Sequence, residues 1–467
     1  MLFSSTVFLF LFLPVVLLLY YIPCAKSRTW RNMVLLFASL LFYAWGEPLF
    51  VFVMLLSIGI NWAAGIAIGC ANGKRKKLEL ILITVFDVGL LFVFKYMTFV
   101  MQNINKIFFG GSMAVREIAL PIGISFFSFQ ILSYIFDVYS GRVKAQKKLT
   151  GLALYISMFP QLVAGPIVRY DTIADELYDR NETWEMAVHG IELFILGLGK
   201  KVILANQLAV IADKAFVLSD VNELSVGMAW LGIVAYTLQI YFDFSGYSNM
   251  AIGLGRIFGF HFPENFNYPY ISGSVTEFWH RWHISLSQWF RDYVYIPLGG
   301  NRVGKVKRVR NMFIVWMLTG IWHGANWTFL LWGVLYFIFL FLEKYTGFLK
   351  KIGKIPAHIY TLLVVMVCWV VFRADSIAAA GRYIGNMFGF GAANGIDEVF
   401  LFYIRNFKVW LVVAIAGCIP WTVMLQERLE KNLLWQFGKE LVKIAILLIS
   451  ISYLLRGTYN PFVYFNF

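Results

Sequence analysis

The stretch MFIVWMLTGIWHGANWTFLLWGVLYFIFLF, residues 312–341, indicates the fold class of this chain. It contains no Asp, Glu, Lys or Arg, and it exceeds the ~20 apolar residues that a helix needs to cross a bilayer. Because lipid offers no hydrogen bonds to the backbone, such a stretch must satisfy its own as a helix. Comparable apolar stretches occur along the whole chain, at residues 4–23, 33–46, 48–70, 79–100, 121–139, 150–168, 186–199, 202–217, 225–242, 358–372, 405–424 and 441–455. We therefore predict an all-α polytopic membrane protein, with re-entrant or interfacial helices where stretches are short.

The composition excludes a water-soluble protein. Of the 467 residues, 60% are hydrophobic and only 14% are charged, whereas soluble domains are about 25% charged. The net charge of +14 comes largely from short basic runs between apolar stretches, such as residues 74–77 and 302–310. That distribution is typical of cytoplasmic loops and argues against a nucleic-acid partner.

The first loops predict the orientation. Lys26, Arg28 and Arg31 follow the first apolar stretch, and the 74–77 run follows the third. The turn at residues 45–48 carries no cation. This alternation predicts an extracytoplasmic N-terminus, and the first stretch, which lacks a basic start and a cleavage site, predicts a retained helix.

Residues 261–311 form a polar, aromatic segment between two apolar blocks. Ser274 and Glu277 have the spacing of a capping box, which predicts a helix from there to about Tyr295. On such a helix the large apolar side chains share one face, namely Trp279, Trp282, Leu286 and Trp289. We expect this helix to lie at the membrane interface or in a funnel open to the cytoplasm.

His323 is an ionisable side chain inside an apolar stretch, where a polar group is costly. A neutral imidazole accepts a proton from a hydroxyl, which is what acyl transfer requires. The alternative is a histidine hydrogen-bonded between helices. Gly320 and Gly324 flank the Trp322–His323 pair and allow close helix approach, and Asn326 is placed to orient the imidazole.

Other polar residues of the segment have competing interpretations. His280 and His283 form an H-x-x-H pair, but a third ligand at metal-site spacing is missing, so we expect no metal. His283 is a candidate for a pocket. The adjacent Arg291 and Asp292 either anchor the segment at the interface or hold a charged donor.

Three acids lie in apolar stretches, at Asp87, Asp137 and Asp243. Each is either an interhelical structural contact or part of a polar conduit, and we favour the structural role.

Several motifs resemble one family when taken together. They are LPIGISFFSFQILSYIFDVYSG (120–141), FPQLVAGPIVRY (159–170), YFDFSGYSNMAIGLGRIFGF (241–260), FWHRWHISLSQWFRDYVYIPLGGNR (278–302), GIWHGANWTFLLWG (320–333), WVVFRADS (369–376) and the final YNPFVYFNF. Their order along nearly the whole chain resembles the membrane-bound O-acyltransferase (MBOAT) family, in particular the bacterial branch that contains the alginate O-acetylation membrane subunit.

The resemblance implies a single integral-membrane domain over residues 1–467, with about eleven transmembrane helices around a central funnel. It also implies that His323 is catalytic and His283 its partner. The implied acyl donor is cytoplasmic acetyl-CoA, without a metal. The implied acceptor is an extracytoplasmic polysaccharide, such as an alginate-like exopolysaccharide or peptidoglycan, reached through an SGNH-like partner transferase at a bacterial inner membrane.

Two alternatives stay open at this point. One is D-alanyl transfer to teichoic acid, and the other is a transporter or scaffold that moves a glycan or lipid without covalent chemistry. In the C-terminal aromatic tail, residues 456–467, Phe462-x-Tyr464-x-x-Phe467 resembles an F-x-Y-x-x-F acyl-carrier motif. Tyr464 is therefore an acyl-carrier candidate, the alternative being an interfacial anchor.

Overall fold

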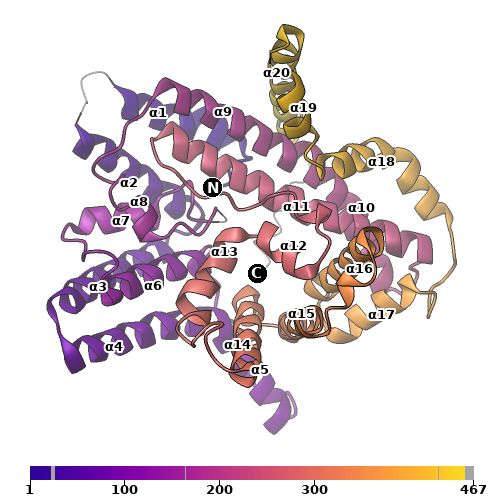
Figure 1. Ribbon diagram of the computed structural model, residues 1–467, viewed down its shortest axis with the longest axis horizontal. Helices are drawn as coiled ribbons and strands as arrows, with labels where there is room; N and C mark the ends of the chain where they lie inside the picture. Colours follow the sequence, from indigo (N-terminus) through magenta and orange to yellow (C-terminus); the bar gives the residue numbers. More distant parts are fainter. Residues whose placement is uncertain (23–26, 164, 430, 458–467) are drawn as a thin grey trace. The chain divides into compact units, whose positions relative to one another are not determined.

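The computed structural model describes residues 1–22, 27–163, 165–429 and 431–457, and this part of the chain is helical without strands (Figure 1). It divides into two compact units. Unit 1 comprises Met1–Phe194 and Ser248–Pro263, and unit 2 comprises Ile195–Tyr247 and Glu264–Phe467. Helices α9 and α11 contribute residues to both units. The all-α class predicted from the sequence is confirmed, whereas the single-domain assignment stays a prediction.

Unit 1 contains the N-terminal helices. They are the π-helical turn η1 (Phe8–Phe12), α1 (Leu13–Tyr21), α2 (Arg28–Gly46), α3 (Phe50–Cys70), α4 (Gly73–Leu91), the π-helical turn η2 (Phe92–Tyr96), α5 (Met97–Phe108), α6 (Ile124–Ser140), α7 (Leu149–Ser157), α8 (Tyr170–Ile173), most of α9 (Trp184–Gly199) and the end of α11 (Val226–Ile257).

The helices α3, α4 and α6 pack side by side in unit 1 (Figure 1). Asn61 on α3 donates a hydrogen bond to Asp87 on α4, with Nδ2 and Oδ1 2.8 Å apart and both side chains buried. Asp137 near the end of α6 pairs with Arg142 at 2.8 Å. Both acids therefore have the partners that a structural role requires, since a buried charge or polar group needs one.

The basic loops of unit 1 gather at one end. Arg28 and Lys148 line the same small pocket, and the ammonium of Lys76 lies 5.4 Å from the ring centroid of Tyr139. The Met1 nitrogen lies beside Gly46, at the opposite end of α2. Which of these ends faces the cytoplasm stays a prediction.

Unit 2 contains the remaining helices. They are the π-helical turn η3 (Lys200–Ala205), α10 (Asn206–Asp220), the first part of α11, the 3-10 turn η4 (Pro269–Ile271), α12 (Val275–Arg281), α13 (Ile284–Phe290), the π-helical turn η5 (Arg291–Tyr295), α14 (Lys305–His323), α15 (Trp327–Thr346), the 3-10 turn η6 (Phe348–Lys350), α16 (Lys354–Arg373), α17 (Ile377–Met387), α18 (Glu398–Gly417), α19 (Trp421–Leu429) and α20 (Leu433–Leu455).

Six helices of the described residues are long and apolar enough to cross a membrane. They are Phe50–Cys70, Gly73–Phe108, Trp184–Asp220, Trp327–Thr346, Lys354–Arg373 and Glu398–Gly417. The membrane character is thus confirmed, and the number of about eleven crossings stays a prediction.

Four predicted spans are wrong. The stretch 150–168 is helical only to Ser157 in α7, because Pro160, three residues later, cannot continue the helix. The stretches 186–199 and 202–217 belong to one continuous helix, Trp184–Asp220, in which Lys200 and Lys201 lie in the π-helical turn η3. The stretch 312–341 is two helices, α14 and α15, joined by the turn 324–326.

Candidate active site

The segment 261–311 supplies the first half of the site. Its capping box is confirmed, because the Ser274 hydroxyl accepts from the Glu277 amide at 2.9 Å. Glu277 in turn accepts from the amide of Gly273, also at 2.9 Å. The four large apolar residues predicted to share a face are all buried.

The prediction of one helix from Ser274 to Tyr295 is wrong. Helix α12 ends at Arg281, and His283 adopts a left-handed backbone with φ of 43° before α13 begins. The loop before α12 replaces the missing helical hydrogen bonds. The amide of Asn267 donates to the Arg281 carbonyl at 2.9 Å, and the amide of Ile284 donates to the Asn265 carbonyl at 3.0 Å. The break turns the imidazole of His283 into the protein.

His283 is only 1% exposed. Its Nδ1 lies 3.1 Å from Oδ1 of Asn265, an acceptor, so Nδ1 carries the proton. Its Nε2 is buried and has no hydrogen-bond partner among the described residues. Burial lowers the pKa of His283 to about 3. The side chain is thus a neutral imidazole that presents an unused acceptor nitrogen.

Asn265 organises this half of the site, and sequence reasoning did not identify it. Its Oδ1 accepts from the Ser285 hydroxyl at 2.9 Å and from the Ser285 amide at 3.2 Å, in addition to His283. Asn265 is 1% exposed. A buried amide that receives three donors fixes the ring of His283. The only signal in the sequence is a polar residue within an aromatic loop, which is too weak to single it out.

Helix α12 is held to α15 by a carboxylate. Glu343 accepts from the amides of Val275 and Thr276 at 2.7 and 2.9 Å, and from the Thr276 hydroxyl at 2.6 Å. The start of α12 leaves unpaired amides that a negative charge satisfies well. Glu343 therefore positions the helix that precedes His283.

His323 supplies the second half of the site. It is the last residue of α14, not the middle of a span, and it is 6% exposed. Aromatic rings surround its imidazole, with centroids at 5.0 Å for Trp322, 5.0 Å for Trp332 and 5.1 Å for Phe372. The indole nitrogen of Trp332 is buried and has no hydrogen-bond partner in the described part of the chain. The imidazole thus lies among aromatic rings, one of which carries this indole N–H.

Close helix contact places His323 at this position. A Cβ added to Gly320 would lie 2.5 Å from the Phe329 carbonyl oxygen, and one added to Gly333 would lie 2.5 Å from that of Trp316. Helices α14 and α15 therefore touch backbone to backbone, as the sequence predicted for Gly320. The ring of Phe329 occupies the equivalent space at Gly324.

Asn326 has a different position from the one expected. Its Oδ1 accepts from the Thr328 amide at 3.1 Å and caps α15, while its Nδ2 donates to the Asp375 carbonyl at 3.0 Å. Neither hydrogen bond goes to His323. Asn326 thus shapes the turn after His323 without contacting its ring through a hydrogen bond.

The two histidines meet at one indole. The ring centroid of Trp322 lies 6.1 Å from that of His283 and 5.0 Å from that of His323. The ring of Phe244 of α11 is perpendicular to that of His283, with their centroids 4.6 Å apart. The structure therefore brings His283, from the break between α12 and α13, next to Trp322 and His323 at the end of α14.

A groove of about 370 Å³ lies beside these helices. Its lining includes Trp279, His280, Ser287, Gln288, Arg291 and Thr319. Arg291 pairs with Asp292 at 2.7 Å. His280 is exposed on this groove while His283 is buried, so the two histidines face different surroundings. Among the described residues, no three His, Cys, Asp or Glu side chains form a group able to hold a metal.

Tyr464 and the aromatic motif around it lie outside the described residues.

Comparisons with known proteins identify the family of this chain. The model of the membrane-bound O-acyltransferase family matches residues 146–373, which include both buried histidines. The chain is 39% identical over its full length to a probable alginate O-acetylase of Pseudomonas putida, all of which it covers. It is 32% identical to the peptidoglycan O-acetyltransferase of Helicobacter pylori, over 100% of this chain and 98% of that protein. Identity to the teichoic acid D-alanyltransferase of Bacillus subtilis is 30%, over 53% of this chain and 65% of that one. This protein belongs to the membrane-bound O-acyltransferase family and is an O-acyltransferase.

Proposed function

We propose that this enzyme takes acetyl groups from cytoplasmic acetyl-CoA for the O-acetylation of an extracytoplasmic polysaccharide. The acceptor is an alginate-like exopolysaccharide or peptidoglycan. The names of the two relatives that align over the full chain support acetyl transfer to such polymers. D-alanyl transfer is less favoured, because the D-alanyltransferase aligns with only 53% of the chain.

The burial of His323 among aromatic rings supports this proposal most strongly. The imidazole acts as the general base for an attacking hydroxyl. The hydroxyl oxygen bonds to the thioester carbonyl carbon, the carbon–sulfur bond breaks, and the hydroxyl proton passes through His323 to the leaving thiolate. The aromatic rings exclude water, which limits hydrolysis of the thioester. His283 orients the reacting groups through Trp322.

The groove next to α12 and α13 is the proposed binding surface for the donor. The side chain of Arg291 is 58% exposed, so it is accessible to the phosphates of coenzyme A. Asp292, which is 12% exposed, holds that guanidinium in place. Arginine suits this role because its planar fork binds phosphate oxygens through paired hydrogen bonds.

Tyr464 is the proposed acceptor of the acetyl group before its transfer outward. A phenol in the C-terminal tail takes the acetyl group as an ester and presents it to a separate SGNH-like transferase. We propose a bacterial inner-membrane location with the N-terminus outside. The separation of basic loops from the N-terminus in unit 1 supports this orientation.

The central test uses membranes that contain the full chain and radiolabelled acetyl-CoA. His323→Ala should abolish label transfer at unchanged protein levels. His189→Ala is the matched control, since that side chain is 54% exposed and pairs with Glu192. Acetyl transfer at the normal rate in His323→Ala would refute the role of His323 as the general base. Label from a D-alanyl carrier protein, with none from acetyl-CoA, would identify the other cargo.

The variant Tyr464→Phe tests the acyl-carrier role of Tyr464 separately from the general-base role of His323. Loss of polymer acetylation in this variant, at normal protein levels, supports a covalent acetyl-tyrosine. Full acetylation in Tyr464→Phe would refute the carrier and leave direct transfer to the polymer or the partner.

A further inference from the structure

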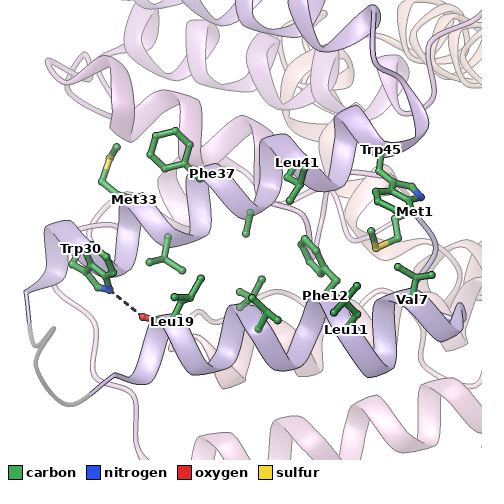
Figure 2. Close-up of a pocket in the computed structure, with 14 residues that line it drawn as sticks. Met1, Val7, Leu11, Phe12, Leu19, Trp30, Met33, Phe37, Leu41 and Trp45 are labelled. Atoms are coloured by element: carbon green, nitrogen blue, oxygen red, sulfur yellow. Dashed lines mark hydrogen bonds between the residues drawn. The ribbon is translucent and has the colours of Figure 1, made fainter.

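An apolar groove lies between the first two helices of unit 1, far along the sequence from the histidines. It encloses about 630 Å³, and its lining is almost entirely apolar (Figure 2). Aliphatic and aromatic side chains from both helices form its walls, among them Leu11, Val15, Leu19, Val34, Phe37 and Leu41. The volume is within the range of about 300–1,000 Å³ that ligand sites occupy. In a membrane protein, such a groove suits a hydrocarbon chain.

A small polar pocket adjoins one end of this groove. It encloses about 140 Å³, and Met33 lines both cavities. The polar pocket is lined by Arg28, Asn32, Lys148, Thr150 and Tyr178, among others. The indole of Trp30, which is 45% exposed, lines the same end of the groove and donates to the Leu19 carbonyl at 3.0 Å. Tryptophan at that position is typical of the headgroup level of a bilayer.

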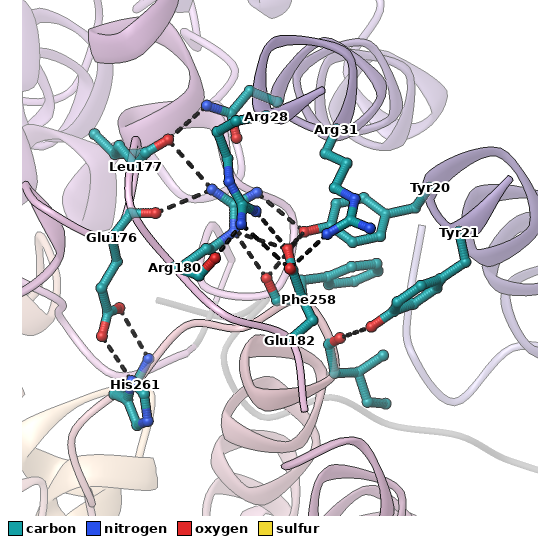
Figure 3. A network of polar contacts seen from close by, with 12 residues as sticks. Tyr20, Tyr21, Arg28, Arg31, Glu176, Leu177, Arg180, Glu182, Phe258 and His261 are labelled. Atoms are coloured by element: carbon teal, nitrogen blue, oxygen red, sulfur yellow. Dashed lines mark hydrogen bonds and ion pairs between the residues drawn. The ribbon is translucent and has the colours of Figure 1, made fainter. Parts of the chain in front are cut away.

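The surroundings of the polar pocket carry excess positive charge. Glu182 pairs with three arginines, Arg28, Arg31 at 2.5 Å and Arg180 at 3.5 Å (Figure 3). Burial alone would raise the pKa of Glu182, but the hydrogen bonds from Arg28 and Tyr20 outweigh it and hold the pKa below its ordinary value. One carboxylate against three guanidinium groups leaves two positive charges.

A nearby lysine adds to this imbalance, and a nearby acid already has a partner. The carboxylate of Glu176 is paired with His261 at 2.6 Å. Lys148 is exposed, with its ammonium 5.4 Å from the ring centroid of Tyr178. The charge at this end of the groove therefore complements an anion.

We propose that the groove and the polar pocket bind one anionic phospholipid, phosphatidylglycerol. One acyl chain lies between α1 and α2, and the phosphodiester lies at Arg28 and Lys148. Basic pockets next to transmembrane helices bind anionic headgroups in this way. Oδ1 of Asn32 is buried without a hydrogen-bond partner among the described residues, and it accepts from a hydroxyl of the glycerol headgroup.

Native mass spectrometry of the purified full chain tests the headgroup site. The protein is incubated with equal amounts of phosphatidylglycerol and phosphatidylethanolamine, and the retained lipids are counted. Lys148→Glu should lower retention of phosphatidylglycerol about fivefold or more, since one cation near a bilayer contributes about 1 kcal/mol. Lys147→Glu is the matched control, because Lys147 is also exposed but does not line the pocket.

A second pair of variants tests the groove itself. Val15→Trp fills the groove and should displace the lipid, whereas Leu18→Trp, on the same helix but outside the lining, should not. Equal retention of both lipids by the wild-type chain would overturn the proposal. So would equal effects of Lys148→Glu and Lys147→Glu, or a dimer of the chain that retains no lipid.

Discussion

The rings of His283 and Trp322 meet edge to face, with their centroids 6.1 Å apart. Trp322 is 4% exposed and directly precedes His323 in α14. One indole thus connects the break between α12 and α13 to the end of α14. We therefore expect that a displacement of this indole changes the position of both imidazoles.

Trp322→Leu should lower the acetylation rate by about 10²-fold, the loss expected when reacting groups move by ~1 Å. Trp322→Phe keeps an aromatic ring and should lose less. The measurement is label transfer from acetyl-CoA at matched protein levels. Equal rates in Trp322→Leu and the wild type would show that the indole does not position the histidines.

The stability of the enzyme should fall below pH 6.5 because of His283. Its pKa is about 3 in the folded chain and ~6.5 when unfolded, so the unfolded state binds the proton between these values. The stabilisation is complete above pH 6.5 and decreases by roughly 1.4 kcal/mol per pH unit as the pH falls. The glutamine of His283→Gln cannot titrate, so this part of the pH-dependent loss of stability should vanish. Melting temperatures in detergent at pH 7.5 and 5.0 measure it, and parallel declines in both proteins would contradict the prediction.

Gly320→Ala should destabilise the pair α14 and α15. Its Cβ would lie 2.5 Å from the Phe329 carbonyl oxygen, and overpacking of this kind costs about 1–3 kcal/mol. The same shift should slow acetylation, since His323 lies one turn further on. Gly381→Ala in α17 is the control, because nothing lies within 4 Å of the added Cβ. A Gly320→Ala protein as stable and active as Gly381→Ala would disprove the close contact.

Asp243→Asn should destabilise unit 2 by about 3–5 kcal/mol, because it leaves the charge of Lys201 buried and uncompensated. The two side chains form an ion pair at 2.5 Å and are 1% and 2% exposed, as the structural interpretation of this acid requires. The double variant Asp243→Leu with Lys201→Met should recover most of that loss. Thermal unfolding of the wild type, the single variant and the double variant measures the loss of stability and its recovery. If acetylation is lost in a double variant that regains full stability, the pair has a role beyond structure.

Short-range patterns in the sequence predicted much of this protein. Apolar stretches determine helices, since lipid leaves the backbone no other partner, and the capping box of Ser274 and Glu277 depends on residues three apart. The isolated His323 was recognisable because an ionisable group in an apolar stretch is costly. The family motifs also lie in continuous segments.

Contacts between residues distant in the sequence determined the features that the sequence did not predict. The break at His283 depends on Asn265, eighteen residues earlier, and local periodicity continued the helix through it. The 312–341 stretch is apolar throughout, so hydropathy could not reveal the turn at residues 324–326, where Asn326 caps the next helix. The contact of His283 with Trp322, and the convergence of Arg28 and Lys148 on one pocket, require side chains from segments that are distant in the sequence. Periodicity identifies which residues are buried, but hydrogen bonds and packing between distant segments determine which of them meet.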